Sequence, residues 1–454
     1  MNSANDVIRV VKEKVVKYIE LQFTDVVGQV KNITIPSAEL PDALNRGIWF
    51  DGSAIEGYAR VAESDMHLVP DAATFAPLPW LGGEQSTARL ICDVFTPDGQ
   101  PFQGDPRAVL RRTIRDAEEM GFTYNTGPEM EFFLLKPRAD GSLLPITPHD
   151  QAGYFDAPSD AATALLRQMA ATLEVFSIQI DAMHHEVAPG QLEIDLHHAD
   201  ALRTADAAVS FRIALKAMAQ AAGFYATFMP KPIQGAAGSG MHVHQSLSYA
   251  ANGRNAFADP GDPYGLSQTA RQFIAGQLAH ARAMCAVLAP LVNSYKRLAS
   301  GYEAPVSINW GRINRTALIR VPRTSSPETT RLELRCPDPA CNPYLAFAVM
   351  LAAGLDGIRQ GLALPDAAEE KLYLANPSAT KPAGPERRES VLPSTTVLPT
   401  SLRQALEALE ADPVIQAALG PVICDRFIHA KRLEWDAYRV EVTDWELRQY
   451  LPLF

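Results

Sequence analysis

The chain has 454 residues, of which 47% are hydrophobic and 20% charged, and its formal net charge is −11. This composition is typical of a soluble globular protein, and the acidic balance argues against general binding to nucleic acid or to an anionic membrane surface. The five cysteines form no CxxC pair, the N-terminus has no apolar signal core, and the longest apolar stretch is shorter than the roughly 20 residues that span a bilayer. We therefore expect a cytoplasmic protein with free thiols.

The first hundred residues are predicted to form a small, mostly-β domain. Residues 16–36 indicate two strands joined by a turn at Gly28, and strand-like pieces continue as far as "ARLICDVF". The Pro- and Gly-rich stretch "FTPDGQPFQGDP" then predicts a domain boundary. Asp105 and Pro106 suit the N-cap and the first turn of a helix that follows this boundary. The expected domains are residues 1–103 and 104–454.

Beyond the boundary, helical and strand-like segments alternate irregularly. Because strands and helices do not alternate one-to-one, an α+β fold with an antiparallel sheet fits better than a doubly wound sheet. The stretch "NPSATKPAGPERRESVLPSTTVLPT" is rich in Pro, Ser and Thr and is typical of an exposed loop. Helices are expected over residues 105–120, 159–175, 199–222, 266–299, 342–361, 401–419 and 424–449. Strands are expected around residues 129–135, 184–196, 240–247, 304–309, 316–321 and 331–336.

Pairs of polar residues recur at positions i and i+2 in the strand-like runs, with an apolar residue between the two members. Residues two apart share one face of a strand, so the members of each pair point the same way. For a single pair, alternation on a half-exposed strand is the simpler interpretation. Four pairs with apolar neighbours instead favour a sheet face that lines a polar cavity. The pairs are Glu129/Glu131, Glu193/Asp195, His242/His244 and Glu333/Arg335, and the cluster "HHEVAPGQLE" adds Glu186.

Carboxylates that converge in a cavity repel one another, and each resists ionisation when it is desolvated. Mg²⁺ or Mn²⁺ would resolve this repulsion, because both ions prefer oxygen ligands and Mn²⁺ also suits an occasional imidazole. Acid-rich metal sites with nearby arginines are what phosphoryl transfer from ATP requires. The sequence has no Walker-type loop, so ATP is not expected to bind in P-loop fashion. The candidate arginines, each of which alone could equally belong to a solvated basic face, are Arg297, Arg315, Arg320, Arg331 and Arg335.

Seven sequence blocks stand in the same order as in one known family. They are "FDGSAIEGYARVAESDM", "GPEMEFF", "HHEVAPGQLEID", "MPKPIQGAAGSGMHVHQSL", "NSYKRLASGYEAPV", "NRTALIRVP" and "RLELRCPDPACNPYLAFAVMLAAGLDGI". Together they resemble type I glutamine synthetase over about residues 16–361, with weaker likeness to the end. The resemblance implies ATP-dependent ligation of ammonia to the γ-carboxylate of L-glutamate through γ-glutamyl phosphate, which gives L-glutamine, ADP and phosphate.

The same resemblance implies a fold and an assembly. The fold would combine an N-terminal β-grasp domain with a catalytic domain whose curved antiparallel sheet is flanked by helices, as in the guanido kinase-like folds. The assembly would be a homododecamer of two hexameric rings, with active sites between neighbouring subunits. Small molecules, namely ATP, L-glutamate and ammonium, are therefore the expected partners, and two or more Mg²⁺ or Mn²⁺ ions are expected in each active site.

Roles follow from the resemblance, motif by motif. Arg315 resembles a catalytic arginine that holds the γ-phosphate of ATP. The ligands of one metal ion would be Glu131, Glu186 and Glu193, and those of the second would be Glu129, His242 and Glu333. The contacts to ATP would be His244, Ser246, Arg320 and Arg331. The contacts to glutamate would be Gly238, Arg297 and Arg335.

An ammonium pocket completes the set that the resemblance implies. Asp51 and Ser53 would come from the adjacent subunit, and Asp51 would take a proton from ammonium. Tyr154 and Glu303 would complete the pocket, with Glu303 on a loop that closes to keep water from the acyl phosphate. Taken without the resemblance, the motif "FDGS" is more simply interpreted as an Asx turn.

The sequence departs from the family pattern at several positions. Ala237 stands where the family usually has Asn, in the loop that borders the substrate amino acid, and Ile313 stands at a usually basic position. Arg60 matches the arginine of subfamilies that glutamine inhibits, so product inhibition is a hypothesis. Tyr373 lies in a segment that only partly resembles the loop modified by adenylylation, and we do not predict that modification.

Three other functions are weighed against glutamate–ammonia ligation. A γ-glutamyl–amine ligase would share the first half-reaction and take a polyamine or an alkylamine, but such relatives tend to alter the positions of Asp51 or Glu303. A catalytically silent assembly would not be expected to keep all six metal ligands. A guanidino kinase would share the arginine-rich phosphate chemistry but would not explain an ammonium pocket.

Overall fold

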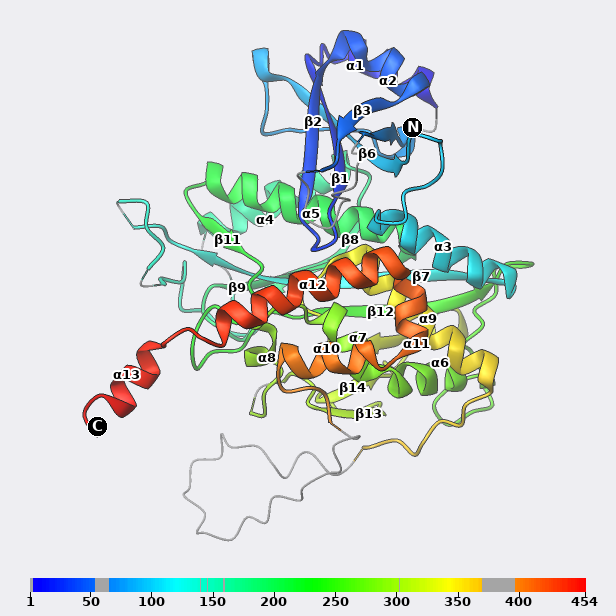
Figure 1. Cartoon of the computed structure of the whole chain (residues 1–454), viewed down its shortest axis with the longest axis vertical. Helices are drawn as coiled ribbons and strands as arrows, with labels where there is room; N and C mark the ends of the chain where they lie inside the picture. The colour runs from blue at the N-terminus through cyan, green and yellow to red at the C-terminus, as the bar shows by residue number, and fades with distance from the viewer. Residues whose placement is uncertain are drawn as a thin grey trace.

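The structure, a computed structural model, describes residues 3–53, 65–138, 140–144, 146–157, 160–301, 303–369 and 397–454. It contains a six-stranded sheet, formed by residues up to Phe95, and a nine-stranded sheet formed by the rest of the chain. Figure 1 shows the smaller sheet at the top of the molecule, with a layer of helices between it and the larger sheet. Within the described ranges, no helix is long and apolar enough to cross a membrane.

The smaller sheet and its two helices enclose their own apolar core. Its elements are α1 (Ala4–Glu13), β1 (Tyr18–Thr24), β2 (Val30–Pro36), α2 (Leu40–Arg46), β3 (Ile48–Asp51), β4 (Asp65–Pro70), β5 (Ala76–Pro77) and β6 (Thr87–Phe95). The strand order is β2-β1-β6-β4-β3 with β5 beside β6, and only the β1–β6 pair is parallel. Ile19, Leu21 and Phe23 alternate along β1 and are buried in this core. The predicted turn between β1 and β2 is confirmed, and Gly28 within it has a φ of +88°, which favours glycine.

The larger sheet is almost entirely antiparallel, as predicted. Its strands are β7 (Phe122–Leu135), β8 (Ile180–His185), β9 (Gln191–Leu196), β10 (Ala199–Asp200), β11 (Tyr225–Thr227), β12 (Met241–Tyr249), β13 (Ser307–Gly311), β14 (Ala317–Arg320) and β15 (Leu332–Leu334). The strand order is β13-β14-β15-β12-β7-β9-β8, with β10 and β11 also paired to β7. Only the β13–β14 pair is parallel. The long strand β7 therefore lies inside the sheet, paired with β12 on one side and with β9 on the other.

The alternation of side chains gives this sheet one apolar face and one partly polar face. Met130, Phe132 and Leu134 of β7 point into the large apolar core, where they are fully buried. Glu129 and Glu131 flank Met130 in the sequence and therefore point to the opposite face. The same alternation holds on β9, β12 and β15, whose Leu, Ile, Val and Met residues lie in the core.

In the described part of the chain, the larger sheet is accompanied by eleven helices, several of which cover its apolar face. They are α3 (Pro106–Glu119), α4 (Asp160–Val175), α5 (Ala201–Ala221), α6 (Gln268–Ala279), α7 (Ala281–Leu288), α8 (Ser294–Arg297), α9 (Pro343–Gln360), α10 (Leu402–Glu410), α11 (Pro413–Leu419), α12 (Pro421–Tyr438) and α13 (Asp444–Tyr450). Helices α3 and α5 pack on β7, and the apolar helix α9 packs against α3, α5 and α6 (Figure 1). The predicted N-cap is confirmed, since the Asp105 carboxylate accepts a hydrogen bond from the backbone N–H of Arg107.

Several predicted boundaries were wrong. The single helix expected over 266–299 is three helices, α6, α7 and α8, with the first break at His280. The single strand expected over 184–196 is the hairpin of β8 and β9, which turns through Gly190 with a φ of +71°. The two C-terminal helices expected are four, because Pro413 begins a new helix within the first and Thr443 caps a new helix, α13, within the second. Most of the loop expected over 376–400 lies outside the described residues.

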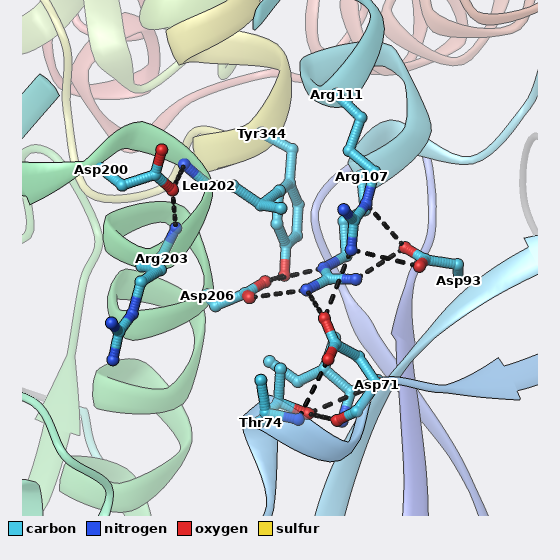
Figure 2. A network of polar contacts seen from close by, with 12 residues as sticks. Asp71, Thr74, Asp93, Arg107, Arg111, Asp200, Leu202, Arg203, Asp206 and Tyr344 are labelled. Carbon is cyan, nitrogen blue, oxygen red and sulfur yellow. Dashed lines mark hydrogen bonds and ion pairs between the residues drawn. The ribbon is translucent and has the colours of Figure 1, made fainter. Parts of the chain in front are cut away.

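A buried arginine joins the two sheets. Arg107 of α3 is only 2% exposed, and its guanidinium donates to Asp93 of β6 at 2.6 Å and to Asp71, just after β4, at 2.8 Å. On its other side it donates to Asp206 of α5 at 2.8 Å, and Asp206 also accepts from the hydroxyl of Tyr344 on α9 at 2.7 Å. Figure 2 shows this guanidinium at the centre of the network. The contacts fix the smaller sheet against the helices of the larger domain.

Candidate active site

Strand pairing places the predicted acids opposite one another on the polar face of the larger sheet. Glu129 of β7 pairs with His242 of β12 on one side and with Asp195 of β9 on the other. Glu131, two residues further along β7, pairs with Glu193 of β9. Four carboxylates and an imidazole therefore converge from three neighbouring strands.

One group of candidate metal ligands is formed by Glu129, His242 and Glu333, whose ligand atoms all lie within 4.8 Å of one another. His242 Nδ1 lies 3.2 Å from Glu129 Oε2 and 3.6 Å from Glu333 Oε1. The other oxygen of Glu129 lies 2.7 Å from His244 Nε2. The family resemblance implies this same trio as the ligands of one ion, and the fold brings the three together from strands far apart in the chain.

The charges in this group are balanced by neighbouring cations and imidazoles. Burial would raise the pKa of Glu129, but hydrogen bonds with His242 and His244 hold it well below its ordinary value. Burial would also raise the pKa of Glu333, but the positive charge of Arg335 lowers it. His242 is desolvated and faces Arg335, so its pKa falls to about 4 and the ring is neutral at pH 7. A neutral imidazole is the form that binds a metal ion.

The second group of acids lacks such a balance. Glu131 Oε2 accepts hydrogen bonds from the backbone N–H of Gly240 at 2.9 Å and from Gln191 Nε2 at 2.8 Å. Even so, desolvation and the charge of Glu186 raise the pKa of Glu131 to about 8. Desolvation and Glu131 together raise the pKa of Glu193 well above its ordinary value. The positive charges of Arg297 and Arg335 act on Glu131, but they do not outweigh desolvation and the neighbouring carboxylates.

This chemistry fits divalent cations. Oxygen donors with one neutral imidazole match the ligands that Mn²⁺ accepts, and Mg²⁺ prefers the carboxylates alone. Acids with raised pKa values are also those whose ionisation a cation would restore. The donor set has a member that sequence analysis missed: His184 Nε2 lies 3.3 Å from Glu193, and with Asp195 these residues form a further group within 4.8 Å. The adjacent histidines of "HHE" were the available signal for His184.

Arginines line the side of the site formed by β14 and β15. Arg320 and Arg335 both donate hydrogen bonds to Glu333, which is fully buried between them. Arg331 donates from Nε to His244 Nδ1 at 3.2 Å. Three of the five predicted arginines therefore lie beside the first group of ligands. Their side chains are placed where they could meet phosphate oxygens.

Ser246 lies on β12 beyond His244 and faces a residue that sequence analysis did not single out. Its hydroxyl lies 3.3 Å from Nε2 of His198. Desolvation and the neighbouring His244 lower the pKa of His198 to about 4, so this ring is neutral. His198 therefore orients the Ser246 hydroxyl. No spacing pattern in the sequence pointed to it.

Arg297 is buried and braces the loop that contains Gly238. Its guanidinium donates to the backbone carbonyls of Arg335, Cys336 and Pro337 at 2.9–3.1 Å. A Cβ atom on Gly240 would lie 2.5 Å from this guanidinium. A Cβ atom on Gly238 would lie 2.4 Å from the carbonyl oxygen of Pro230. The two glycines are thus required for the close approach of the loop to the arginine.

Tyr154, Glu303 and Arg315 lie together near the second group of acids. Arg315 forms an exposed ion pair with Glu303 at 4.0 Å. Desolvation raises the pKa of the Tyr154 phenol, against the influence of the adjacent Arg315. The Tyr154 ring stacks on Phe155 with a centroid distance of 4.0 Å and meets His184 edge-on. An aromatic wall therefore stands beside the acids of the β8–β9 hairpin.

Two predicted residues lie on the other sheet. Asp51 ends β3 of the six-stranded sheet, and Ser53 follows it. The backbone N–H of Ser53 donates to the Asp51 carboxylate at 2.8 Å, which is the Asx-type turn that the local sequence favours. Both side chains are thus presented by the smaller domain and not by the sheet that carries the acids.

The residues that differ from the family pattern lie in different structural environments. Ala237 packs with Phe133 and Ala188 in a small apolar cluster. The side chain of Ile313 is exposed. Arg60 and Tyr373, on which the hypotheses about regulation depend, lie outside the described residues.

Comparison with protein-family models finds two matches that follow one another along the chain. The glutamine synthetase β-grasp domain matches residues 15–97, and the glutamine synthetase catalytic domain matches residues 103–450. The chain belongs to the glutamine synthetase family. The expected β-grasp domain and curved-sheet catalytic domain are thereby confirmed, and this family member is a ligase.

Individual relatives support the same assignment. The glutamine synthetase of Thermus thermophilus is 50% identical over 99% of both chains, and that of Clostridium saccharobutylicum is 48% identical over 98% of both. Among solved structures, one described as a GmaS/ADP complex has a TM-score of 0.85 and 33% identity, and the match covers 100% of both chains. An apo GmaS structure has a TM-score of 0.84 and 34% identity.

Proposed function

We propose that this ligase joins ammonia to the γ-carboxylate of L-glutamate at the expense of ATP. The observation that carries the proposal is the convergence of Glu129, His242 and Glu333 beside the acids of the second group, with arginines along one side. Such a site suits a reaction in which phosphate charge must be neutralised. The relatives that are 48–50% identical over nearly the whole chain bear the name glutamine synthetase.

The two groups of acids would hold two divalent ions, Mg²⁺ or Mn²⁺. Such ions supply positive charge that stabilises the ionised carboxylates and polarises phosphate oxygens. We assign Glu129, His242 and Glu333 to one ion. We assign the second ion to three acids, Glu131, Glu186 and Glu193.

The first half-reaction depends on phosphate charge. The glutamate γ-carboxylate attacks the γ-phosphorus of ATP, the bond to the β-phosphate oxygen breaks, and γ-glutamyl phosphate and ADP form. Arg315 stabilises charge on the transferred phosphoryl group. Arg320 and Arg331 contact the nucleotide phosphates, together with His244 and Ser246. Arg297, Arg335 and the Gly238 backbone orient the glutamate.

The second half-reaction needs a neutral amine in a pocket that excludes water. Asp51 of an adjacent subunit takes a proton from ammonium, and Ser53, Tyr154 and Glu303 form the rest of the pocket. Ammonia then attacks the acyl carbon and phosphate leaves. We propose a dodecamer of two hexameric rings for this reason, because within one chain Asp51 is presented by the smaller sheet.

A second candidate is a γ-glutamyl–amine ligase with the same first half-reaction. It is favoured by the likeness to GmaS, a γ-glutamylmethylamide synthetase, and by Ala237 in the substrate loop. The presence of Asp51, Tyr154 and Glu303 together favours ammonia.

ADP release separates the two candidates. The purified enzyme is incubated with ATP, Mg²⁺ or Mn²⁺ and L-glutamate, and with ammonium, methylamine, ethanolamine, putrescine or spermine in turn. We expect ammonium to give the highest kcat/KM. Turnover with a larger amine and none with ammonium would overturn the proposal in favour of the second candidate.

A further inference from the structure

Behind the aromatic wall lies a buried cluster of two histidines and one aspartate that the proposed reaction does not use. His149 and His185 side chains are both fully buried, and Asp150 between them is 14% exposed. One ligand atom from each of the three lies within 4.8 Å of the others. The cluster joins the end of β7, the loop before Tyr154 and the end of β8.

The hydrogen bonds of this cluster orient both imidazole rings toward the same carboxylate. The Nδ1 atom of His185 lies 2.7 Å from the carbonyl oxygen of Glu186, and Nδ1 of His149 lies 3.3 Å from the carbonyl oxygen of Leu134. Carbonyls only accept, so each Nδ1 carries a proton, and each Nε2 is the ring atom left to face Asp150. Both Nε2 atoms face the carboxylate of Asp150, at 2.8 Å for His149 and 3.0 Å for His185. The His185 contact has the geometry of a hydrogen bond, whereas the His149 contact does not.

Two atoms of the cluster lack any hydrogen bond. His149 Nε2 and Asp150 Oδ2 are buried without a hydrogen-bond partner although they lie 2.8 Å apart. The carboxylate oxygen therefore lies away from the direction in which a ring N–H would point. Desolvation also lowers the pKa of His149, so a second proton on this ring is disfavoured. Orphaned buried groups of this kind call for an ion or a water molecule.

We propose that Nε2 of His149, a carboxylate oxygen of Asp150 and Nε2 of His185 bind a Zn²⁺ ion that is separate from the ions of the reaction. Two imidazoles and a carboxylate are common zinc ligands, and the Nδ1–carbonyl contacts are the outer contacts that ligating histidines usually make. Adjacent ligand atoms around tetrahedral zinc are about 3.3 Å apart, close to the separations in this cluster. A water molecule completes the coordination.

The ion would brace the pocket wall. His185 directly precedes Glu186, and the carbonyl of His185 accepts a hydrogen bond from the backbone N–H of Phe155 at 3.1 Å. Asp150 Oδ1 also accepts from the backbone N–H of Gly190 at 3.1 Å, in the β8–β9 turn. A bound ion would thus fix the aromatic turn and the hairpin with respect to each other.

Zinc content tests the site. The full-length wild type, His149→Asn and His197→Asn are loaded with Zn²⁺, dialysed into Mg²⁺ buffer, and analysed by inductively coupled plasma mass spectrometry. His197 is the matched control, because it is an exposed histidine paired with Asp181 outside the cluster. We expect the wild type and His197→Asn to hold one more zinc per chain than His149→Asn. Equal zinc content in the wild type and His149→Asn would overturn the proposal.

Crystals of the wild type give a test that does not depend on folding of a variant. Anomalous diffraction at the zinc edge is expected to show a peak between His149, Asp150 and His185. Diffraction from zinc-loaded crystals without a peak at this position would equally overturn the proposal. Neither measurement depends on which amine the enzyme uses, so the two proposals fail or stand separately.

Discussion

At the residue scale, the main feature of the site is a buried carboxylate that is paired with oppositely charged arginines. Glu333 is fully buried and accepts hydrogen bonds from Arg320 and Arg335. Its carboxylate is ionised at neutral pH although it is desolvated, because Arg335 lowers its pKa. The side chain thus orders the two arginines, and it is one of the oxygen ligands that we propose for a metal ion.

Replacing Glu333 by Gln is expected to damage both stability and activity. The substitution leaves two arginines without their buried counter-charge, which costs roughly 3–5 kcal/mol of unfolding free energy. Chemical denaturation in EDTA measures this loss, and ADP release with Mg²⁺ is expected to fall at least 100-fold. Glu328→Gln, at an exposed glutamate of the same region, is the control that should leave both unchanged. Full activity of Glu333→Gln would contradict the assigned role.

At the scale of elements, the apolar pattern predicted one continuous helix where the structure has a break at His280. His280 separates α6 from α7, and its ring lies between Asp412 at 2.7 Å and Asp356 at 3.0 Å. No Pro or Gly marks this break in the sequence, so periodicity alone predicted one helix. By contrast, the alternation of β7, β9, β12 and β15 was visible in the sequence and correctly predicted which side chains share a face.

The His280 contacts make stability depend on pH. Burial opposes the charge on this ring, but hydrogen bonds with Asp412 and Asp356 raise its pKa. A group with a raised pKa in the folded state stabilises fully below its unfolded pKa of about 6.5, and the contribution is lost as pH rises through the folded value. Thermal unfolding of His280→Asn should therefore show a larger loss of stability at pH 6 than at pH 9. His429→Asn, at an exposed histidine, should show no such dependence.

At the scale of the whole molecule, the sequence was enough to predict the family and the acidic residues of the site. It was not enough to predict which neighbouring residues contact those acids. The resemblance named Glu129, His242 and Glu333 as one set, and the structure brings them together. It did not name His184 or His198, because their contacts form only when strands far apart in sequence pair. We propose that the chain divides near residue 103, between the end of β6 and the start of α3.

Arg107 is expected to hold these two parts together. In Arg107→Met, three aspartates at the seam lose a shared buried partner, so we expect a loss of roughly 3–5 kcal/mol in unfolding free energy and faster proteolysis near residues 96–104. Denaturation and limited proteolysis measure these effects. Arg115→Ala changes an exposed arginine of the same helix and should behave as the wild type. An unchanged Arg107→Met protein would show that the network does not join the domains.

The central claim is that glutamate is activated as an acyl phosphate and then transferred to ammonia. L-glutamate labelled with ¹⁸O in its γ-carboxylate tests it most directly, when the phosphate released during turnover with ATP and ammonium is analysed by mass spectrometry. The account predicts one ¹⁸O atom in each phosphate, because the γ-carboxylate oxygen leaves with the phosphoryl group. Unlabelled phosphate, or labelled phosphate only when a larger amine replaces ammonium, would contradict it.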